Sequence, residues 1–206
     1  MIKTTKQHRE YWQNRKIDWK TSYLDTWNHP HRTLVSAVLR TIPFYSLWEV
    51  GCGPGANLVR IVKDMPGKQV GGSDINADAI ELAKKTFSGG MFHVEPVDNL
   101  MMSDNSIDVV LSDATLIYYS PLRIKKALRE MKRVGRTHLV FCELHDTSWW
   151  KRWSYRFKRG YNVYNYKKLL EEMGCYDIQM FKIPKEFWEG TPWEEFGYII
   201  KCKLPR

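Results

Sequence analysis

The sequence has few cysteines and no closely spaced pair of them. Its four cysteines lie far apart and form no Cys-x-x-Cys motif, so neither a zinc site nor a disulfide framework is indicated. No apolar run approaches the length of a membrane-spanning helix, and the first residues lead into no apolar signal core. Internal repeats and low-complexity linkers are also lacking. The chain of 206 residues is therefore expected to be one domain of ordinary size in a reducing cytoplasm.

Positive charge is in excess. The formal net charge is +9, from 32 Lys and Arg against 23 Asp and Glu, and the pI is about 9.3. With 43% apolar and 14% aromatic residues, the composition is that of a globular protein rather than a disordered one. The charge favours acidic partners: nucleic acid, an anionic lipid surface, or a phosphorylated or carboxylated substrate.

Three glycines at alternate positions follow an apolar run that contains Glu49. These are Gly51, Gly53 and Gly55, and the next segment, 57–63, has the apolar spacing of a helix. The pattern predicts a strand, a tight turn and a helix, the layout of a nucleotide-binding βα unit. Glycine is needed there because the chain must turn sharply and leave its backbone bare to a ligand.

Residues 49–55, Glu-Val-Gly-Cys-Gly-Pro-Gly, closely resemble motif I of the class I S-adenosylmethionine-dependent methyltransferases. Glu49, Pro54 and Gly55 argue against the dinucleotide pattern, which Gly51-x-Gly53-x-x-Ala56 also fits. The resemblance covers about residues 46–203 and is closest to the family's small-molecule enzymes. It implies a Rossmann-like α/β fold with a seven-stranded, mostly parallel sheet of order 3-2-1-4-5-7-6, strand seven antiparallel. It also implies S-adenosylmethionine as cofactor and S-adenosylhomocysteine as product.

The resemblance also implies where the cofactor is held. Asp74, about twenty residues past the glycines, lies at the end of the predicted strand 68–75, where a carboxylate can accept hydrogen bonds from both ribose hydroxyls. After the next strand, 91–94, Pro96 replaces the family's adenine-contacting Asp, which leaves the Val97 backbone and the Asp98 side chain as candidates. The expected cofactor contacts are Glu49, Gly51, Cys52, Gly53, Pro54, Gly55, Asp74, Ile75, Val97, Asp98, Asn99 and Ser112.

Three residues are candidates for catalysis. Asp113 and Tyr118 follow the predicted strand 107–112, and open α/β sheets place their chemistry at such a strand end. The Asn/Asp-Pro-Pro-Tyr/Phe motif of methylases acting on DNA amines is absent here. His145, just after the predicted strand 137–142, is the best general-base candidate, with a purely structural histidine as the alternative. Methyl transfer often needs no base, because positioning the nucleophile supplies much of the rate.

Residues 149–161 carry five positive charges, six aromatic rings and no acid. Three interpretations compete: a lid over a small acidic acceptor, a surface that stacks on bases and binds phosphates, and an anionic membrane interface. The lid is the favoured one. The predicted substrate-binding residues are Tyr119, Trp149, Trp150, Trp153 and Arg156.

Residues 1–45 are predicted to form an N-terminal helical cap, with helices over 6–15 and 30–41. The second helix begins at His29-Pro30, since proline is tolerated in a first turn. Its residues His31 and Arg32, with Trp27 and His29, either line the site or simply pack on the sheet. Residues 46–206 form the methyltransferase domain, with the basic aromatic insertion at 147–161, in one structural domain overall.

The predicted function is transfer of a methyl group by in-line displacement to an oxygen or nitrogen of a small or lipid-like, anionic acceptor. An RNA methyltransferase and a non-catalytic S-adenosylmethionine-binding module are the alternatives. Peripheral contact with an anionic membrane is a further partner suggested by the basic aromatic segment, and no metal is expected. The sequence does not name the acceptor or the oligomeric state.

Overall fold

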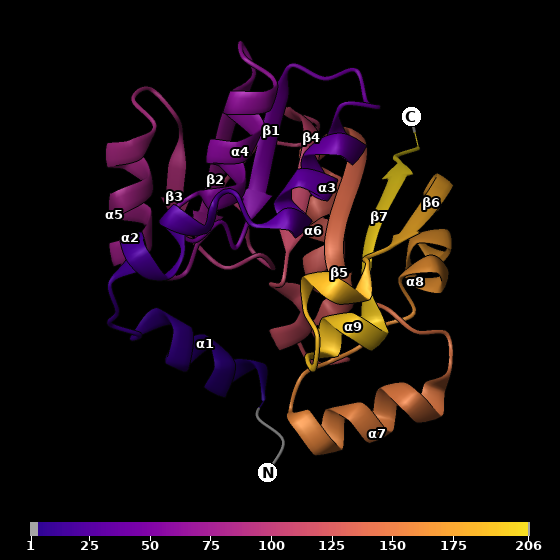
Figure 1. Cartoon of the computed structure of the whole chain (residues 1–206). Coiled ribbons are helices and arrows are strands. Elements are labelled where there is room, and N and C mark those ends of the chain that lie inside the picture. Colours follow the sequence, from indigo (N-terminus) through magenta and orange to yellow (C-terminus); the bar gives the residue numbers. More distant parts are fainter. Residues whose placement is uncertain (1–3, 206) are drawn as a thin grey trace.

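A seven-stranded sheet forms the centre of the molecule in a computed structural model that describes residues 4–205 (Figure 1). The strand order is β3-β2-β1-β4-β5-β7-β6, and only β7 runs antiparallel to its neighbours in this sheet. This confirms the predicted fold. The strands are β1 (Ser46–Val50), β2 (Gln69–Asp74), β3 (Phe92–Val94), β4 (Ile107–Asp113), β5 (Gly135–Leu144), β6 (Tyr176–Lys182) and β7 (Gly197–Lys203).

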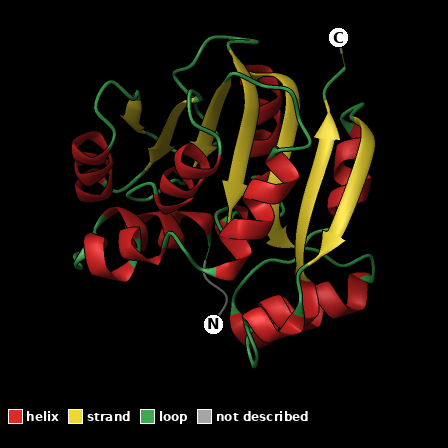
Figure 2. Ribbon diagram, turned by 45° about the horizontal axis from the view of Figure 1, so that its top comes forward, coloured by secondary structure: helices red, strands yellow, loops and turns green. Residues whose placement is uncertain are grey.

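Helices cover both faces of the sheet (Figure 2). One face packs against α3, α4 and α5, and the other against α6 and α8. The helices are α1 (Thr5–Gln13), α2 (Trp19–Ser22), α3 (Pro30–Leu39), α4 (Ala56–Asp64), α5 (Ala77–Thr86), α6 (Ile124–Val134), α7 (Trp149–Arg159), α8 (Tyr166–Glu172) and α9 (Pro192–Phe196). Short 3₁₀ turns lie at Leu24–Thr26, Leu116–Tyr118 (η2) and Lys185–Phe187. No helix of the described chain is long and apolar enough to cross a membrane.

The central strands are apolar on both sides because each of their faces is covered. Successive side chains of a strand point to opposite faces. Leu47 and Val109 therefore join the cluster under α3 and α4, while Trp48 and Val110 join the cluster under α6 and α8. Such doubly covered parallel strands read as continuous apolar runs rather than alternating ones.

The carboxyl ends of the parallel strands all meet at one edge of the sheet, the lower edge in Figure 1. Helix α1 lies beyond this edge and begins at a capping box in which the Thr4 hydroxyl accepts from the Gln7 backbone N–H. At the opposite edge, α6 passes into β5 without a loop, so β5 starts at Gly135 rather than at the predicted residue 137. Gly135 can begin the strand because it already pairs with Ile107 of β4.

Replacement of Leu128 by Ala is expected to lower the free energy of unfolding by about 2–5 kcal/mol. Leu128 lies on α6, has no exposed surface, and fills the core between that helix and the sheet. The matched control is Leu122→Ala, at a side chain that is 93% exposed, which should change stability by less than about 0.5 kcal/mol. Denaturant titration of both variants measures the difference, and equal losses would contradict the assignment of this core.

Candidate active site at the carboxyl edge of the sheet

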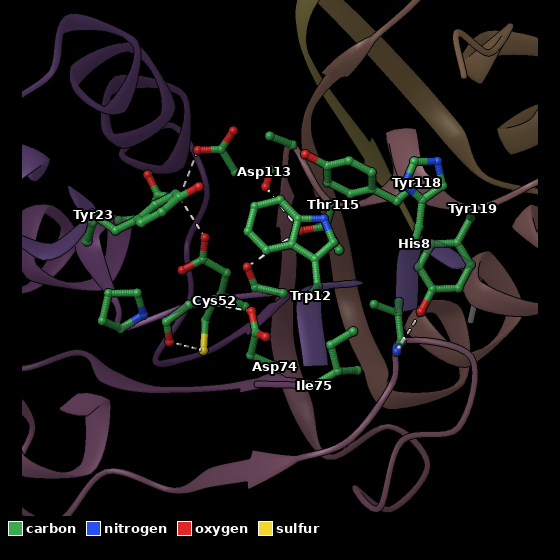
Figure 3. A pocket seen from close by; sticks show the side chains of 18 of the residues that line it. His8, Trp12, Tyr23, Cys52, Asp74, Ile75, Asp113, Thr115, Tyr118 and Tyr119 are labelled. Carbon is green, nitrogen blue, oxygen red and sulfur yellow. Dashed lines mark hydrogen bonds between the residues drawn. The ribbon is translucent and has the colours of Figure 1, made fainter. Parts of the chain in front are cut away.

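A cavity of about 290 Å³ lies at the carboxyl ends of β1, β2 and β4, under α1 (Figure 3). This is the switch point of the sheet order, where open α/β sheets bind their ligands. Of the residues expected to bind cofactor or substrate or to act in catalysis, eleven line it: Glu49, Gly51, Cys52, Gly53, Pro54, Asp74, Ile75, Val97, Asp113, Tyr118 and Tyr119.

The glycine turn brings bare backbone to the cavity. Gly51 and Gly53 adopt positive φ values of +67° and +52°, which favour glycine. A Cβ at Gly51 would collide with Thr115, whereas a Cβ at Gly53 would meet no atom within 4 Å. The Gly53 N–H donates to Asp74 Oδ2 at 2.9 Å, which joins this turn to the end of β2.

Glu49, next to the last residue of β1, is a buried carboxyl group beside the cavity. Its Oε1 accepts a hydrogen bond of 2.6 Å from the Asn57 amide on α4. Its Oε2 is buried and has no hydrogen-bond partner among the residues that the structure describes. Burial outweighs the hydrogen bond from Asn57 and raises the pKa of Glu49 to about 8. The group therefore suits a positively charged or hydrogen-bond-donating ligand.

Asp113, at the end of β4, joins three elements through one oxygen atom. Asp113 Oδ2 lies 3.0 Å from His31 Nε2 and 3.4 Å from Arg32 Nη1 of α3, and accepts at 2.9 Å from Asn57 Nδ2. Burial alone would raise the pKa of Asp113, but the charges of His31 and Arg32 hold it well below its ordinary value. Asp113 is thus an ionised carboxylate that holds α3 against the cavity.

Glu143 of β5 is a buried carboxyl group that holds the turn after β4, which forms part of the cavity wall. Its Oε1 accepts from the Ser112 hydroxyl and from the backbone N–H groups of Thr115 and Leu116, all at 2.8–2.9 Å. Burial raises the pKa of Glu143 to about 7 despite these bonds. Ser112, a predicted cofactor contact, is committed to Glu143 and does not line the cavity.

The roof of the cavity comes from α1, which contributes Thr5, His8, Arg9 and Trp12. The Trp12 ring packs edge-on against Tyr118 at 5.3 Å, and in Figure 3 it lies across the centre of the cavity. Burial raises the pKa of the Tyr118 hydroxyl above its ordinary value. None of the four roof residues was expected to be part of the site, because nothing in the local sequence of α1 marks it.

The region expected to hold adenine is already partly occupied by the protein's own contacts. The Asp98 carboxylate pairs with Arg9 at 2.5 Å and with Arg123 at 3.2 Å, and does not line the cavity. The Val97 N–H donates to the Tyr119 hydroxyl at 3.0 Å. Asn99 is exposed on the outside of this turn.

Gly55 and His145, two more predicted site residues, lie away from the cavity. Gly55 caps α4 with a φ of +91°, and a Cβ there would collide with Phe87. The His145 Nδ1 accepts from the Tyr166 N–H at 3.1 Å, and its ring packs against Tyr198. Burial lowers the pKa of His145 to about 4. The structure therefore brings neither residue to the other candidates.

Helix α7 also lies apart from the cavity. Trp149, Trp150, Trp153 and Arg156 all belong to it, and none of its residues lines the cavity. The helix ends at Gly160, in the left-handed conformation, and the next residue, Tyr161, packs edge-on against Tyr118 at 5.8 Å. Tyr161, just after α7, thus contacts the cavity wall, whereas the predicted substrate contacts on α7 do not line the cavity.

The cavity fits a ligand with positive charge and several hydrogen-bond donors. Four carboxyl groups, those of Glu49, Asp74, Glu95 and Asp113, line it at the carboxyl ends of neighbouring strands. Buried Trp12 Nε1 and Trp19 Nε1 have no hydrogen-bond partner within residues 4–205, so both can donate to a ligand. S-Adenosylmethionine has the matching groups: a sulfonium, an ammonium and two ribose hydroxyls. Across the described chain, no group of three His, Cys, Asp or Glu side chains is arranged to hold a metal ion.

Glu49→Gln is expected to flatten the pH dependence of stability. The carboxyl pKa rises from 4.5 in the unfolded chain to about 8 in the folded protein, so the unfolded chain binds fewer protons between these values. Wild-type stability should therefore fall as the pH rises from 4.5 to 8, and Gln removes this loss while it still accepts from Asn57. Urea titrations at several pH values measure it, with the exposed Glu10→Gln as control. Parallel curves for wild type and Glu49→Gln would contradict the burial of an uncompensated carboxyl group.

Comparisons with known proteins match part of the chain to a methyltransferase domain and match its fold to methyltransferase structures. Residues 48–138 match the family model described as a methyltransferase domain. No curated protein matches the chain by sequence. Magnesium protoporphyrin IX methyltransferase from Synechocystis PCC 6803, with bound S-adenosylmethionine, has a TM-score of 0.66 at 14% identity, covering 100% of this chain and 99% of that one. A methyltransferase of Methanosarcina mazei gives 0.63 at 19% identity, covering 81% and 96%.

The [4+2]-cyclase SpnF also has this fold, with a TM-score of 0.67 at 16% identity, covering 99% of this chain and 98% of that one. At such low identities, these likenesses establish the fold alone. The match over residues 48–138 includes the glycine turn, Asp74 and Asp113. This part of the chain therefore matches a methyltransferase domain, for which S-adenosylmethionine is the implied cofactor, and the chain as a whole has the fold of the S-adenosylmethionine-dependent methyltransferases.

Proposed function

We propose that this protein transfers the methyl group of S-adenosylmethionine, by in-line displacement, to an oxygen or nitrogen of a small or lipid-like, anionic acceptor. The observation that carries this proposal is that two unlike walls face one cavity. Glu49 and Asp74 stand on one wall, and the aromatic rings of Trp188 and Trp193 stand on another, beside His31. The acidic wall suits the cofactor, and the aromatic wall suits an acceptor with an apolar body.

The cofactor is proposed to lie along the glycine turn. Asp74 accepts from the ribose hydroxyls, as its position at the end of β2 favours. Glu49 and Asp113 face the amino-acid end, where Arg32 supplies positive charge for the cofactor's carboxylate. Ile75 packs against the adenine. Residues 1–45 then act as the proposed helical cap, because α1 and α3 supply the roof and one wall.

The acceptor is proposed to enter against the aromatic wall. The Trp188 ring packs against His31 with ring centroids 4.3 Å apart, and against Trp193 at 4.8 Å. These rings bury an apolar body, and the formal net charge of +9 on the chain favours an anionic acceptor. Magnesium protoporphyrin IX is the acceptor named for the Synechocystis neighbour, and it is a large ring compound.

Bound S-adenosylmethionine supplies a methyl group on a positively charged sulfur, which leaves as a neutral thioether. The residues of the chain hold the acceptor in line with that methyl group and exclude water. His31 is not free to act as a base, since Nε2 faces Asp113 and Nδ1 lies 2.6 Å from His29 Nδ1. His145 is remote. The proposed catalysis therefore rests on positioning of the cofactor and the acceptor, and the methylated product gives up the acceptor's proton to bulk water once it leaves the cavity.

Gly53→Ala is expected to weaken S-adenosylmethionine binding by roughly tenfold or more, because its methyl group would enter the space proposed for the cofactor. Gly67→Ala is a matched control. Gly67 also has a positive φ, +84°, and open space at its Cβ, but it lies in the turn before β2 and outside the cavity. Both variants should lose similar stability, and only Gly53→Ala should lose affinity in calorimetry. Equal affinities would remove the basis for this cofactor position.

Trp188→Ala is expected to lower methyl transfer by about tenfold or more and to change S-adenosylmethionine affinity by less than about threefold. Wild type or variant protein is incubated with methyl-labelled cofactor and fractionated cell extract, and the label transferred to the small-molecule, lipid, RNA and protein pools is counted. The exposed Tyr45→Ala is the control. Label in small molecules or lipids supports the proposed acceptor, whereas label in RNA shows that the protein is an RNA methyltransferase instead. If no pool is labelled although the cofactor binds, the protein is a binding module.

A further inference from the structure

Helix α7 presents four large aromatic side chains to solvent. Trp149, Trp150, Trp153 and Phe157 are 68%, 56%, 49% and 56% exposed, and we call them the aromatic ridge. Helix neighbours recur every three to four residues, so positions 149, 153 and 157 follow one another along a single stripe, with Trp150 beside it. Scattered exposed hydrophobic residues need no explanation, but a contiguous patch of this kind marks an interaction site.

The ridge is displayed by a helix that is fixed to the domain through its other face. Tyr155, on the opposite side, packs against Phe196 of α9 with ring centroids 4.9 Å apart. The Ser148 hydroxyl caps the first turn by accepting from the Lys151 N–H, and Arg152 donates to the carbonyl groups of Asp146 and Thr147. In Figures 1 and 2, α7 lies along the outside of the molecule, and residues 4–205 leave the ridge side chains about half exposed or more.

Positive charge surrounds the ridge. Helix α7 carries five basic residues and no acidic one. Lys151 pairs with Glu195 at 3.2 Å, whereas Lys158 and Arg159 are exposed and have no ion pair with any described residue. Long basic side chains that flank an apolar surface can lay their alkyl stems along it and extend their charges to phosphate groups.

The rings of the ridge are packed against one another. Trp150 stacks on Trp153 at 5.2 Å and 22°, Phe157 packs against Trp153 at 4.3 Å, and Trp149 against Trp150 at 5.5 Å. Single-stranded nucleic acid needs open ring faces for its bases and a positively charged groove for its backbone. Here Trp150 and Trp153 stack on each other, so each ring covers one face of the other, and the surface is the convex side of one helix rather than a groove. A continuous apolar ridge of this form suits insertion into a lipid interface instead.

We propose that the aromatic ridge of α7 docks this protein on the surface of a lipid bilayer that contains anionic lipids. The four rings enter the boundary between headgroups and acyl chains, and Lys158 and Arg159 contact lipid phosphates. Tryptophan is favoured at this depth because its ring is apolar and its N–H is polar. The inference holds whichever acceptor the cavity takes. It also gives α7 a role outside the cavity, in place of the expected lid.

Co-sedimentation of the full-length protein with vesicles tests the proposal, without cofactor or turnover. The vesicles contain phosphatidylcholine alone or with roughly one-third phosphatidylglycerol. Wild type should sediment with the anionic vesicles and much less with the neutral ones, and high salt should weaken the binding. Lys158→Glu with Arg159→Glu should lower the affinity by roughly tenfold or more, and Trp153→Ser with Phe157→Ser by a similar factor.

The control pair is Lys84→Glu with Lys85→Glu on α5, which makes the same change of charge at another exposed helix. It should keep most of the wild-type affinity, and far-ultraviolet circular dichroism verifies that every variant is folded. The proposal is overturned if wild type binds neither vesicle, or if the control pair loses as much as the α7 pairs. Tighter binding to single-stranded RNA than to anionic vesicles, lost in the α7 variants, would assign the ridge to nucleic acid instead.

Discussion

One buried carboxylate, that of Asp113, holds the cavity of this protein together. Through Oδ2 it meets His31 and Arg32 of α3 and Asn57 of α4, while its own strand lies between β1 and β5. A buried ion without partners would be very costly, so the carboxylate and the two basic groups stabilise one another only in this arrangement. The N-terminal helices are therefore part of the site and not only a covering for the sheet.

The carboxyl groups around the cavity differ in ionisation, although they are similar in burial. Asp113 is kept ionised by neighbouring positive charge, whereas burial raises the pKa of Glu49 to about 8 and that of Glu143 to about 7. Asp113 holds α3 and α4 at the cavity wall, and Glu143 holds the turn that carries Thr115. Glu49, which lines the cavity, keeps one buried oxygen that has no hydrogen-bond partner among residues 4–205. Similar side chains thus have separate tasks, set by their partners.

Features that depend on neighbouring residues could be predicted from the sequence. The glycine turn, the strand that ends at Asp74 and the alternation of strands and helices predict a parallel sheet with helices on both faces, and the strand order implied by the family resemblance is the one that the structure has. The roof and the Asp113 cluster depend on contacts between distant segments, such as His31 with Asp113, 82 residues apart, for which a single sequence holds no signal. The same limitation applies to Asp98, because its pairing with Arg9, 89 residues away, is visible only in three dimensions.

The short link between α7 and the cavity places two binding surfaces in physical contact through one segment of chain. Only Gly160 separates the end of α7 from Tyr161, whose ring packs against Tyr118 in the cavity wall. Thermodynamic linkage requires that coupling between two binding sites be reciprocal. If occupation of the helix surface changes affinity in the cavity by some factor, occupation of the cavity must change the affinity of that surface by the same factor. The strength with which the protein holds its surface partner would then report whether the cavity is filled.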